Sequence, residues 1–220
     1  MSVVEIIGLD ASTFVRSVLM ACIEKGIPHR LVNGPVGDGS GLKSPAFLAL
    51  NPYGRMPVMR HNGFLLFETS AIIRYLEAEF GGRRLIPTET KMATVAEQWT
   101  SAIGFSGYRN LIVNYLFHYI FPKGADGGPD RAAVEGGLPA MKRELEILEG
   151  GLEHGTYFCG EEPTMPDLLL VPILEYMRRM PESGHEMARL PRLSRLMAAF
   201  EERESYGRTL PERLKKAAAE

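Results

Sequence analysis

The hydrophobic pattern of this chain changes near residue 82. Before it, patterns typical of strands alternate with helical ones, and after it the pattern is helical. Residues 3–7 form a compact β-type run, and the apolar positions from 14 to 23 then recur on one helical stripe. Gly26 and Pro28 close that stripe, and residues 29–32 favour a second strand. Because a helix connects the two strands, we expect them to be parallel with a right-handed crossover.

A hairpin followed by a helix is predicted next. Two short apolar runs, 58–60 and 64–67, flank Asn62-Gly63, a pair that accepts positive φ and therefore indicates a tight antiparallel turn. Apolar residues then recur at helical spacing until Gly81-Gly82, with the hydroxyls around Thr69 as expected caps. The exposed N–H groups at the start of that helix could hold a carboxylate ligand.

Beyond residue 87 the strand signals fade. Long helical windows cover 89–121, 131–152, 165–180 and 191–203, and the stretches 124–129 and 181–184 are expected to be loops. The fold class predicted is α/β plus all-α. We expect an α/β domain over 1–82, a linker over 83–90 and an all-helical domain over 91–220.

A capping box opens one helix of the second domain. Thr164 stands three residues before Asp167, the spacing at which each side chain can satisfy a backbone N–H at a helix start. The apolar run 168–171 that follows should be core. We therefore give this motif a structural role.

Composition and charge limit the classes of partner and the cellular compartment that we expect for this protein. The 220 residues are 45% apolar with a net charge of −2 and a pI near 6.2, so a nucleic-acid partner is not favoured. The first residues lack a signal peptide pattern, and no apolar run is long enough to span a membrane. Cys22 and Cys159 lie far apart, which is typical of a reduced cytoplasmic protein.

Other sites are weakly supported. The glycine-rich stretch 33–41 lacks the Lys-Ser/Thr of a phosphate loop and favours a surface loop. The five histidines show no spacing typical of metal ligands, so no metal is expected. A Ser-His-Asp hydrolase would need a nucleophile elbow, which is not present in the sequence. Cys22 falls on the apolar stripe and is expected to be a small buried hydrophobe.

The order Asn-Pro-x-Gly-x-x-Pro from Asn51, a hairpin and then Glu-Thr-x-Ala-Ile from Glu68 resembles the soluble glutathione S-transferases. The resemblance implies a thioredoxin-like first domain followed by a helical bundle domain, and a cis peptide before Pro57. It is strongest over 1–80 and 157–175. It points to the serine-type classes such as phi and theta, with a bacterial look.

The resemblance assigns the glutathione contacts. It implies that Arg55, Met56 and Pro57 offer backbone groups to the cysteinyl part of glutathione. Glu68 and Thr69 would hold the γ-glutamyl part. The resemblance also implies that Lys43 contacts the glycyl carboxylate, whereas the histidine often found before it is a leucine here.

Glutathione conjugation, the reaction that the resemblance implies, requires the thiolate of glutathione, since the thiol itself is a poor nucleophile. Ser12 lies between the first strand and the first helix, where the serine-type family places a hydroxyl that donates to sulfur, and Thr13 is the alternative. A serine at this position is also a common helix N-cap, so both roles stay open. Arg16 follows one turn later, and we expect it to pair with an acid such as Glu68.

The second substrate is expected between the domains, beside the first long helix of the second domain. Tyr108, Leu111, Ile112 and Tyr115 recur there at helical spacing. The same stripe is equally typical of an interhelical core or a dimer contact. Tyr53 is expected to reach across a subunit interface, because the family is usually dimeric.

The sequence thus predicts a cytoplasmic, homodimeric glutathione transferase that acts in detoxification. Glutathione is the co-substrate, a small apolar electrophile is the second substrate, and no other cofactor is expected. Two alternatives use the same scaffold. One is a glutathione-dependent peroxidase or isomerase, and the other is a non-catalytic interaction protein that retains the fold.

Overall fold

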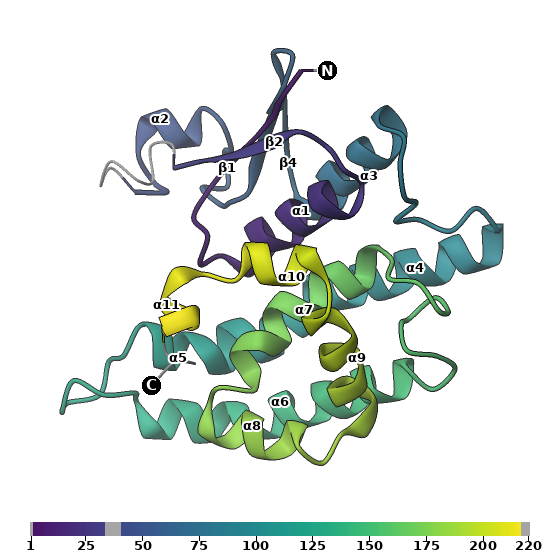
Figure 1. Cartoon of the computed structure of the whole chain (residues 1–220). Helices are drawn as coiled ribbons and strands as arrows, with labels where there is room; N and C mark the ends of the chain where they lie inside the picture. Colours follow the sequence, from purple (N-terminus) through teal and green to yellow (C-terminus); the bar gives the residue numbers. More distant parts are fainter. Residues whose placement is uncertain (1, 34–40, 217–220) are drawn as a thin grey trace. The chain divides into compact units, whose positions relative to one another are not determined.

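A computed structural model describes residues 2–33 and 41–216 (Figure 1). The chain forms two compact units. The N-terminal unit comprises residues 1–86 together with 201–220, and the helical unit comprises residues 87–200. Most of the predicted glycine-rich surface loop, residues 34–40, lies outside the described residues.

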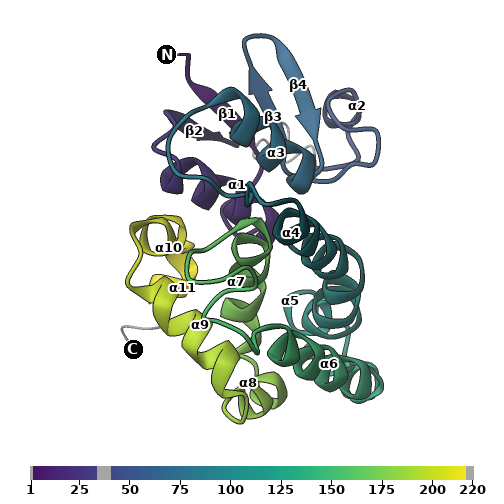
Figure 2. The same cartoon turned by 90° about the vertical axis from the view of Figure 1, so that its right-hand side faces the viewer.

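The N-terminal unit is built on a four-stranded mixed sheet (Figure 2). The strands stand in the order β2-β1-β3-β4, with β1 and β2 parallel and the other neighbours antiparallel. Its elements up to residue 79 are β1 (Val4–Ile7), α1 (Thr13–Glu24), β2 (His29–Val32), α2 (Pro45–Leu48), β3 (Val58–His61), β4 (Phe64–Phe67) and α3 (Thr69–Glu79). This topology confirms the predicted parallel pair and the thioredoxin-like domain.

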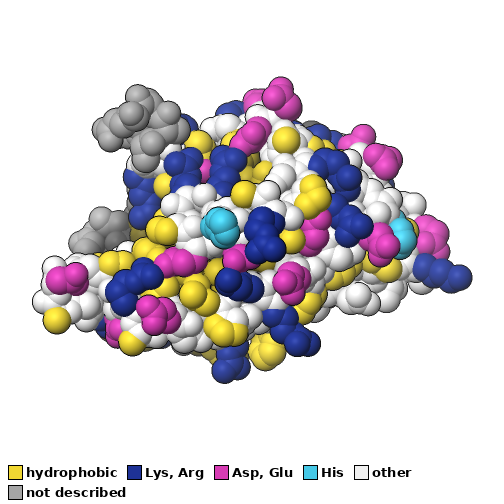
Figure 3. All heavy atoms as spheres, turned by 90° about the horizontal axis from the view of Figure 1, so that it is seen from below, with side chains coloured by type: hydrophobic (Ala, Val, Ile, Leu, Met, Phe, Trp, Pro, Cys, Tyr) yellow, Lys and Arg dark blue, Asp and Glu magenta, His cyan; other side chains and the backbone are white. Residues whose placement is uncertain are grey.

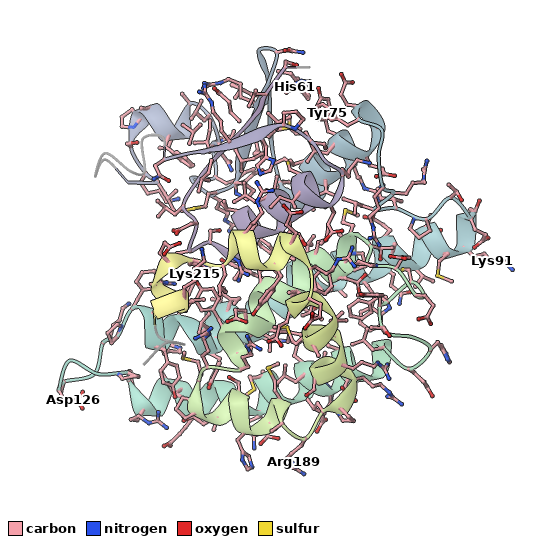
Figure 4. All side chains as sticks on the ribbon, in the orientation of Figure 1. His61, Tyr75, Lys91, Asp126, Arg189 and Lys215 are labelled. Carbon is pink, nitrogen blue, oxygen red and sulfur yellow. The ribbon has the colours of Figure 1, made fainter. Side chains whose placement is uncertain are left out.

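A two-residue turn sets the register of the β3-β4 hairpin. Asn62 and Gly63 both have positive φ, 51° and 82°, as the predicted turn requires. His61 therefore pairs with Phe64. His61 is also hydrogen bonded through Nδ1 to the hydroxyl of Tyr75, at 2.7 Å, and Figure 4 shows the two side chains side by side. The hairpin is thus tied to α3 as well as to β1.

Both faces of the sheet are covered. Ile7 and Val58 are register partners, and they pack with Phe47 of α2 in one apolar cluster. Ile6 pairs with Met59 of β3. Their side chains point to the opposite face of the sheet, where both are fully buried. Sheets with two buried faces need apolar residues at consecutive positions, which explains the unbroken run 6–7.

The end of the chain belongs to the N-terminal unit, although the sequence placed it in the helical domain. The helices α10 (Glu204–Thr209) and α11 (Glu212–Lys216) lie here, and α10 packs against α1 (Figures 1 and 2). Glu24 accepts hydrogen bonds from Arg203 at 2.8 and 2.6 Å and from Ser205 at 2.5 Å. These contacts join positions about 180 residues apart, a pairing that no local pattern encodes.

The helical unit confirms the predicted windows, with one correction. Its elements are α4 (Thr90–Ala102), η1 (Ile103–Leu116), α5 (Phe117–Ile120), α6 (Arg131–Gly151), α7 (Met165–Met177), α8 (Pro181–Met187) and α9 (Pro191–Glu201). The loop predicted at 181–184 is wrong, because α8 begins there. Pro181 occupies the first helical position, where its missing N–H costs nothing, so the proline starts a helix instead of breaking one.

The segment η1 is a π-helix, wider than an α-helix. The N–H of Phe117 donates to the carbonyl of Ile112, five residues earlier. Its buried face follows this wider spacing, through residues 103, 107, 111–112 and 115–116. The predicted α-helical stripe is therefore rotated, which leaves Tyr108 half-buried while Leu111 and Ile112 are buried.

Tyr115 lies in a hydrogen-bond network at the start of α8. Its hydroxyl donates to Glu182 at 2.9 Å and accepts from the N–H of Ser183 at 3.2 Å. Tyr119 and Arg131 also donate to Glu182, at 2.5 and 2.6 Å. Burial alone would raise the pKa of Glu182, but these hydrogen bonds hold it at about 2. The network therefore joins η1, α5, α6 and α8 around a carboxylate that is ionised at neutral pH.

The capping box at α7 is present. Asp167 is fully buried, and its carboxylate accepts from the N–H of Thr164 at 2.7 Å and from the N–H of Phe158 at 3.0 Å. The Thr164 hydroxyl is bonded to the same carboxylate at 2.8 Å. Burial raises the pKa of Asp167 to about 6, although the hydrogen bonds from Phe158 and Thr164 oppose it. The confirmed motif thus also fixes the loop before α7.

The surface charge is mixed, as the small net charge of the sequence indicated. Acidic and basic side chains are interspersed on the face seen in Figure 3, without a stripe of one sign. Within the described ranges, every helix is too short or too polar to cross a membrane.

Replacing Asp167 by alanine should lower the free energy of unfolding by about 3 kcal/mol, because three buried donors lose their acceptor. Asp167→Asn keeps the size and one acceptor oxygen, so roughly half of that loss is expected. Urea denaturation monitored by circular dichroism measures both. An unchanged midpoint for the alanine variant would contradict the role of the cap.

Tyr115→Phe should cost about 1–2 kcal/mol of stability, since the buried Ser183 N–H and the Glu182 carboxylate each lose a partner. Tyr53→Phe is the matched control, because the Tyr53 side chain is 60% exposed and little change is expected. Thermal unfolding compares the two. Equal melting temperatures for both variants would show that the Tyr115 hydroxyl is not structural.

Candidate functional site

The strand register gathers the predicted glutathione residues at one end of the sheet. Ile7 pairs with Val58, and Val58 pairs with Phe67. The chain therefore leaves β1, enters β3 and leaves β4 at the same end of the sheet. The segment that carries Ser12 follows β1, Pro57 precedes β3, and Glu68 follows β4. Residues far apart in sequence are thus brought together by the pairing alone.

Ser12 is the N-cap of α1. Its backbone is extended (φ −75°, ψ 126°), and its Oγ accepts a hydrogen bond from the N–H of Val15 at 3.4 Å. Accepting this bond uses a lone pair and leaves the hydroxyl proton free to donate. The two roles considered for this serine, helix cap and donor to sulfur, are therefore compatible.

Thr13 is less accessible than its neighbour. It is the first residue of α1 and only 7% exposed, whereas Ser12 is half-buried. Its carbonyl accepts from the Ser17 hydroxyl at 3.0 Å, inside the helix. Exposure thus favours Ser12 of the two hydroxyls.

A buried asparagine shapes the turn before Pro57. Asn51 is 1% exposed; its Nδ2 donates to the carbonyl of Arg55 at 2.7 Å and its Oδ1 accepts from the N–H of Tyr53 at 3.0 Å. Gly54 has φ 60°, and a Cβ there would stand 2.6 Å from the Leu42 carbonyl oxygen. The sequence reasoning assigned no role to Asn51. An asparagine directly before a proline in a turn could have suggested one.

The peptide bond between Met56 and Pro57 is cis, as the resemblance implied. Met56 also connects the turn to the segment after β1, because its Sδ accepts from the N–H of Leu9 at 3.3 Å. Arg55 is exposed at the turn, and Pro57 is buried at the start of β3. The segment 55–57 is thus held in place from two sides.

Lys43 lies against the same turn. Its Nζ donates to the carbonyl of Tyr53 at 3.1 Å, in an exposed position. An ammonium group has three donors, so two remain for an anion. The lysine is therefore placed next to the turn by a contact that does not consume its charge.

The start of α3 differs from the sequence prediction. Glu68, and not a hydroxyl residue, is the N-cap, and no side chain caps the helix. Glu68 is exposed and has φ 72°, a left-handed conformation that costs a non-glycine residue on the order of 1–3 kcal/mol. Thr69 follows at 6% exposure. The N–H groups of the first turn carry the positive end of the helix dipole without a protein acceptor from a side chain, which suits a carboxylate ligand.

Arg16 is fully buried one turn after Ser12, and its N–H donates to the Ser12 carbonyl at 3.0 Å. Its guanidinium carbon lies 5.8 Å from the ring centre of Tyr206 in α10. The expected pairing with Glu68 stays a prediction. Sequence reasoning missed Tyr206, because it belongs to the far end of the chain.

Neither cysteine is an activated thiol. Burial raises the pKa of Cys22 to about 12 and also raises that of Cys159. Among the described residues, no group of three or more histidine, cysteine and acidic side chains could hold a metal ion.

The second-substrate candidates lie in η1. Leu111, Ile112 and Tyr115 are buried there, and the Tyr115 hydroxyl is engaged with Glu182. Tyr108 is half-buried, with its ring in edge contact with Phe117 at 6.4 Å. Of the four, Tyr108 has the most accessible side chain.

Comparison with known proteins gives consistent matches along the chain. Models of the glutathione S-transferase N-terminal and C-terminal domains match residues 6–84 and 108–204. Glutathione S-transferase 3 of Zea mays is 29% identical over 214 residues, which cover 96% of this chain and 94% of the maize protein. Glutathione S-transferase F6 of Arabidopsis thaliana is 27% identical over 183 residues, covering 82% of this chain and 86% of that protein.

The fold matches as well. The crystal structure of poplar glutathione transferase F1 superposes with a TM-score of 0.83 at 26% identity, covering 98% of this chain and 100% of that chain. These relatives are plant proteins of the serine-type phi class, so the predicted class is confirmed and the bacterial look is not. From the sheet order, the helical unit and both family matches, we conclude that this chain belongs to the glutathione S-transferase family.

Proposed function

We propose that this protein is a glutathione transferase that joins the thiolate of glutathione to a small apolar electrophile. The observation that carries the proposal is that a hydroxyl group and a helix start without a side-chain cap follow strands that end at the same end of the sheet, with a lysine held against the turn that enters β3. The family matches support the same activity. Ser12, Thr69 and Lys43 supply these groups.

Ser12 stabilises the thiolate as a hydrogen-bond donor. A free cysteine thiol has a pKa of about 8.5, and lowering it by two units requires roughly 2.7 kcal/mol of preference for the thiolate. A hydrogen bond to a charged acceptor contributes about 1.5–3 kcal/mol. The Val15 N–H bond to Oγ polarises the hydroxyl further, since hydrogen bonds in a chain strengthen one another.

The rest of glutathione is held by opposite charge and backbone groups. The γ-glutamyl carboxylate takes the N–H groups at the start of α3 together with the Thr69 hydroxyl, and Glu68 takes the α-amino group. The cysteinyl backbone pairs with the segment 55–57, whose conformation Asn51 fixes. The glycyl carboxylate takes the two remaining donors of Lys43.

The electrophile is assigned to η1. We propose that Tyr108 contacts it, because its side chain is half-exposed, and that Leu111, Ile112 and Tyr115 shape the helix that presents Tyr108. A role in detoxification follows from this substrate class.

Association and location complete the proposal. Tyr53, Phe64 and Leu65 are exposed apolar side chains of the N-terminal unit, at 60%, 49% and 40%, and they favour a homodimer. Sedimentation velocity, which measures the mass of the protein in solution, tests the proposed homodimer.

Both cysteines are free thiols, which fits the reducing cytoplasm where glutathione is abundant.

Ser12→Ala should lower kcat/KM with glutathione and chlorodinitrobenzene about 10- to 1000-fold, the effect of losing one donor to the developing charge. Asp130→Ala is the matched control, because it removes a side-chain cap from α6, a helix of the other unit. Thr13→Val tests the alternative hydroxyl. Equal rates for wild type and Ser12→Ala would move the role to Thr13 or a backbone group.

Lys43→Ala should raise the KM for glutathione roughly tenfold and leave kcat within about twofold, since an exposed charge-assisted contact binds ground and transition states alike. Lys91→Ala is the control, because Lys91 projects outward at the start of α4 (Figure 4). Calorimetric titration with glutathione measures the affinity directly. No uptake by the wild type at millimolar concentration would end the transferase proposal and favour an interaction protein.

A further inference from the structure

Through α10, the segment 201–216 packs against α1, the helix that Ser12 caps. Arg203 and Ser205 anchor this segment to Glu24 near the C-terminal end of α1. From that anchor, α10 packs against α1 (Figures 1 and 2). The next residue, Tyr206, is 6% exposed and points its ring at the guanidinium of Arg16.

Arg16 is a costly residue to bury. Its side chain is 0% exposed and heads the fully buried side chains of the described residues by volume. Replacing a buried ionic group by an apolar residue of similar size is often neutral or stabilising. Stability alone therefore does not account for an arginine here, and its charge calls for a role.

The helix geometry directs that charge toward Ser12. The N–H of Arg16 donates to the Ser12 carbonyl, so the two residues are one turn apart on α1. Side chains on an α-helix lean toward its N-terminus, and a long side chain covers the turn before its own Cα. A buried cation acts over a longer range than an exposed one, because the surrounding dielectric constant is low.

The ring of Tyr206 restricts where that cation can go. A guanidinium within about 6 Å of an aromatic ring centre is attracted to the ring face, and the attraction is larger when both groups are desolvated. Here the separation is 5.8 Å and both side chains are buried. The ring contact thereby limits the positions that the guanidinium of this flexible side chain can adopt.

We propose that Tyr206 is a positioning residue for thiol activation: it holds the Arg16 guanidinium where its charge lowers the pKa of the glutathione thiol at Ser12. This inference rests on the proposed transferase function and extends it to the far end of the chain. Ser12 donates to sulfur directly, Arg16 contributes positive potential, and Tyr206 acts through Arg16 alone.

The test is the thiol pKa of bound glutathione, read from thiolate absorbance as a function of pH. Tyr206→Leu should raise that pKa by about 0.5–1 unit, a smaller shift than a direct ion pair produces. Tyr206→Phe retains the ring face and should rescue the wild-type value. Thermal unfolding of each variant is recorded in parallel, because packing losses change the melting temperature and not the thiol pKa.

A double-mutant cycle tests whether Tyr206 acts through Arg16. Arg16→Met should raise the thiol pKa at least as far as Tyr206→Leu does, and Tyr206→Leu should add no further shift in the Arg16→Met background. Additive shifts would overturn the inference, since they would mean that Tyr206 acts by another route.

The failures are distinguishable. If Ser12→Ala raises the thiol pKa while Tyr206→Leu changes only the melting temperature, the transferase function stands and the positioning role is refuted. If the wild-type protein takes up no glutathione, or binds it with an unshifted thiol pKa, the proposed function is refuted and the positioning role with it.

Discussion

The register that aligns Ile7, Val58 and Phe67 is the constraint on which the site depends. It places the exits of β1 and β4 and the entry to β3 at one end of the sheet, and the proposed contacts of Ser12, the segment 55–57, Glu68 and Thr69 follow from that alignment. Slipping the hairpin by one residue would turn Val58 away from Phe47 and onto the opposite face, which Ile6 and Met59 already fill. The same apolar packing that stabilises the sheet therefore also sets the geometry of the chemistry.

Much of the site is backbone. The cis bond before Pro57, the left-handed residue Glu68 and the uncapped start of α3 present amide groups, and Asn51 holds the turn that carries them. In the proposed site, side chains add a hydroxyl proton from Ser12, a positive charge from Lys43 and the polar groups of Glu68 and Thr69. Such a site tolerates wide sequence change elsewhere, consistent with relatives that share the fold at 26% to 29% identity.

Local signals in the sequence predicted the elements that depend on short-range chemistry. Asn62-Gly63 predicted the hairpin because both residues adopt positive φ, and Thr164 with Asp167 predicted the start of α7. The failures have physical reasons of another kind. A proline inside a helix breaks it, whereas Pro181 stands at the first helical position and is compatible with a helix, a distinction that the residue type alone does not make. The π-helical spacing of η1 shifts its buried face by a fraction of a turn per repeat. The contact between Arg16 and Tyr206 spans the chain and left no local trace.

The anchoring of Arg203 and Ser205 on Glu24 also has a consequence for biosynthesis. A ribosome releases the first 86 residues long before it makes residue 206, and domains generally fold in the order in which they emerge. During that interval the face of α1 against which α10 packs stays uncovered, so Arg16 is more exposed to water. The thioredoxin-like unit is thus completed only after residues 201–216 have been synthesised, so a chain terminated before them would carry the serine without its full electrostatic surroundings.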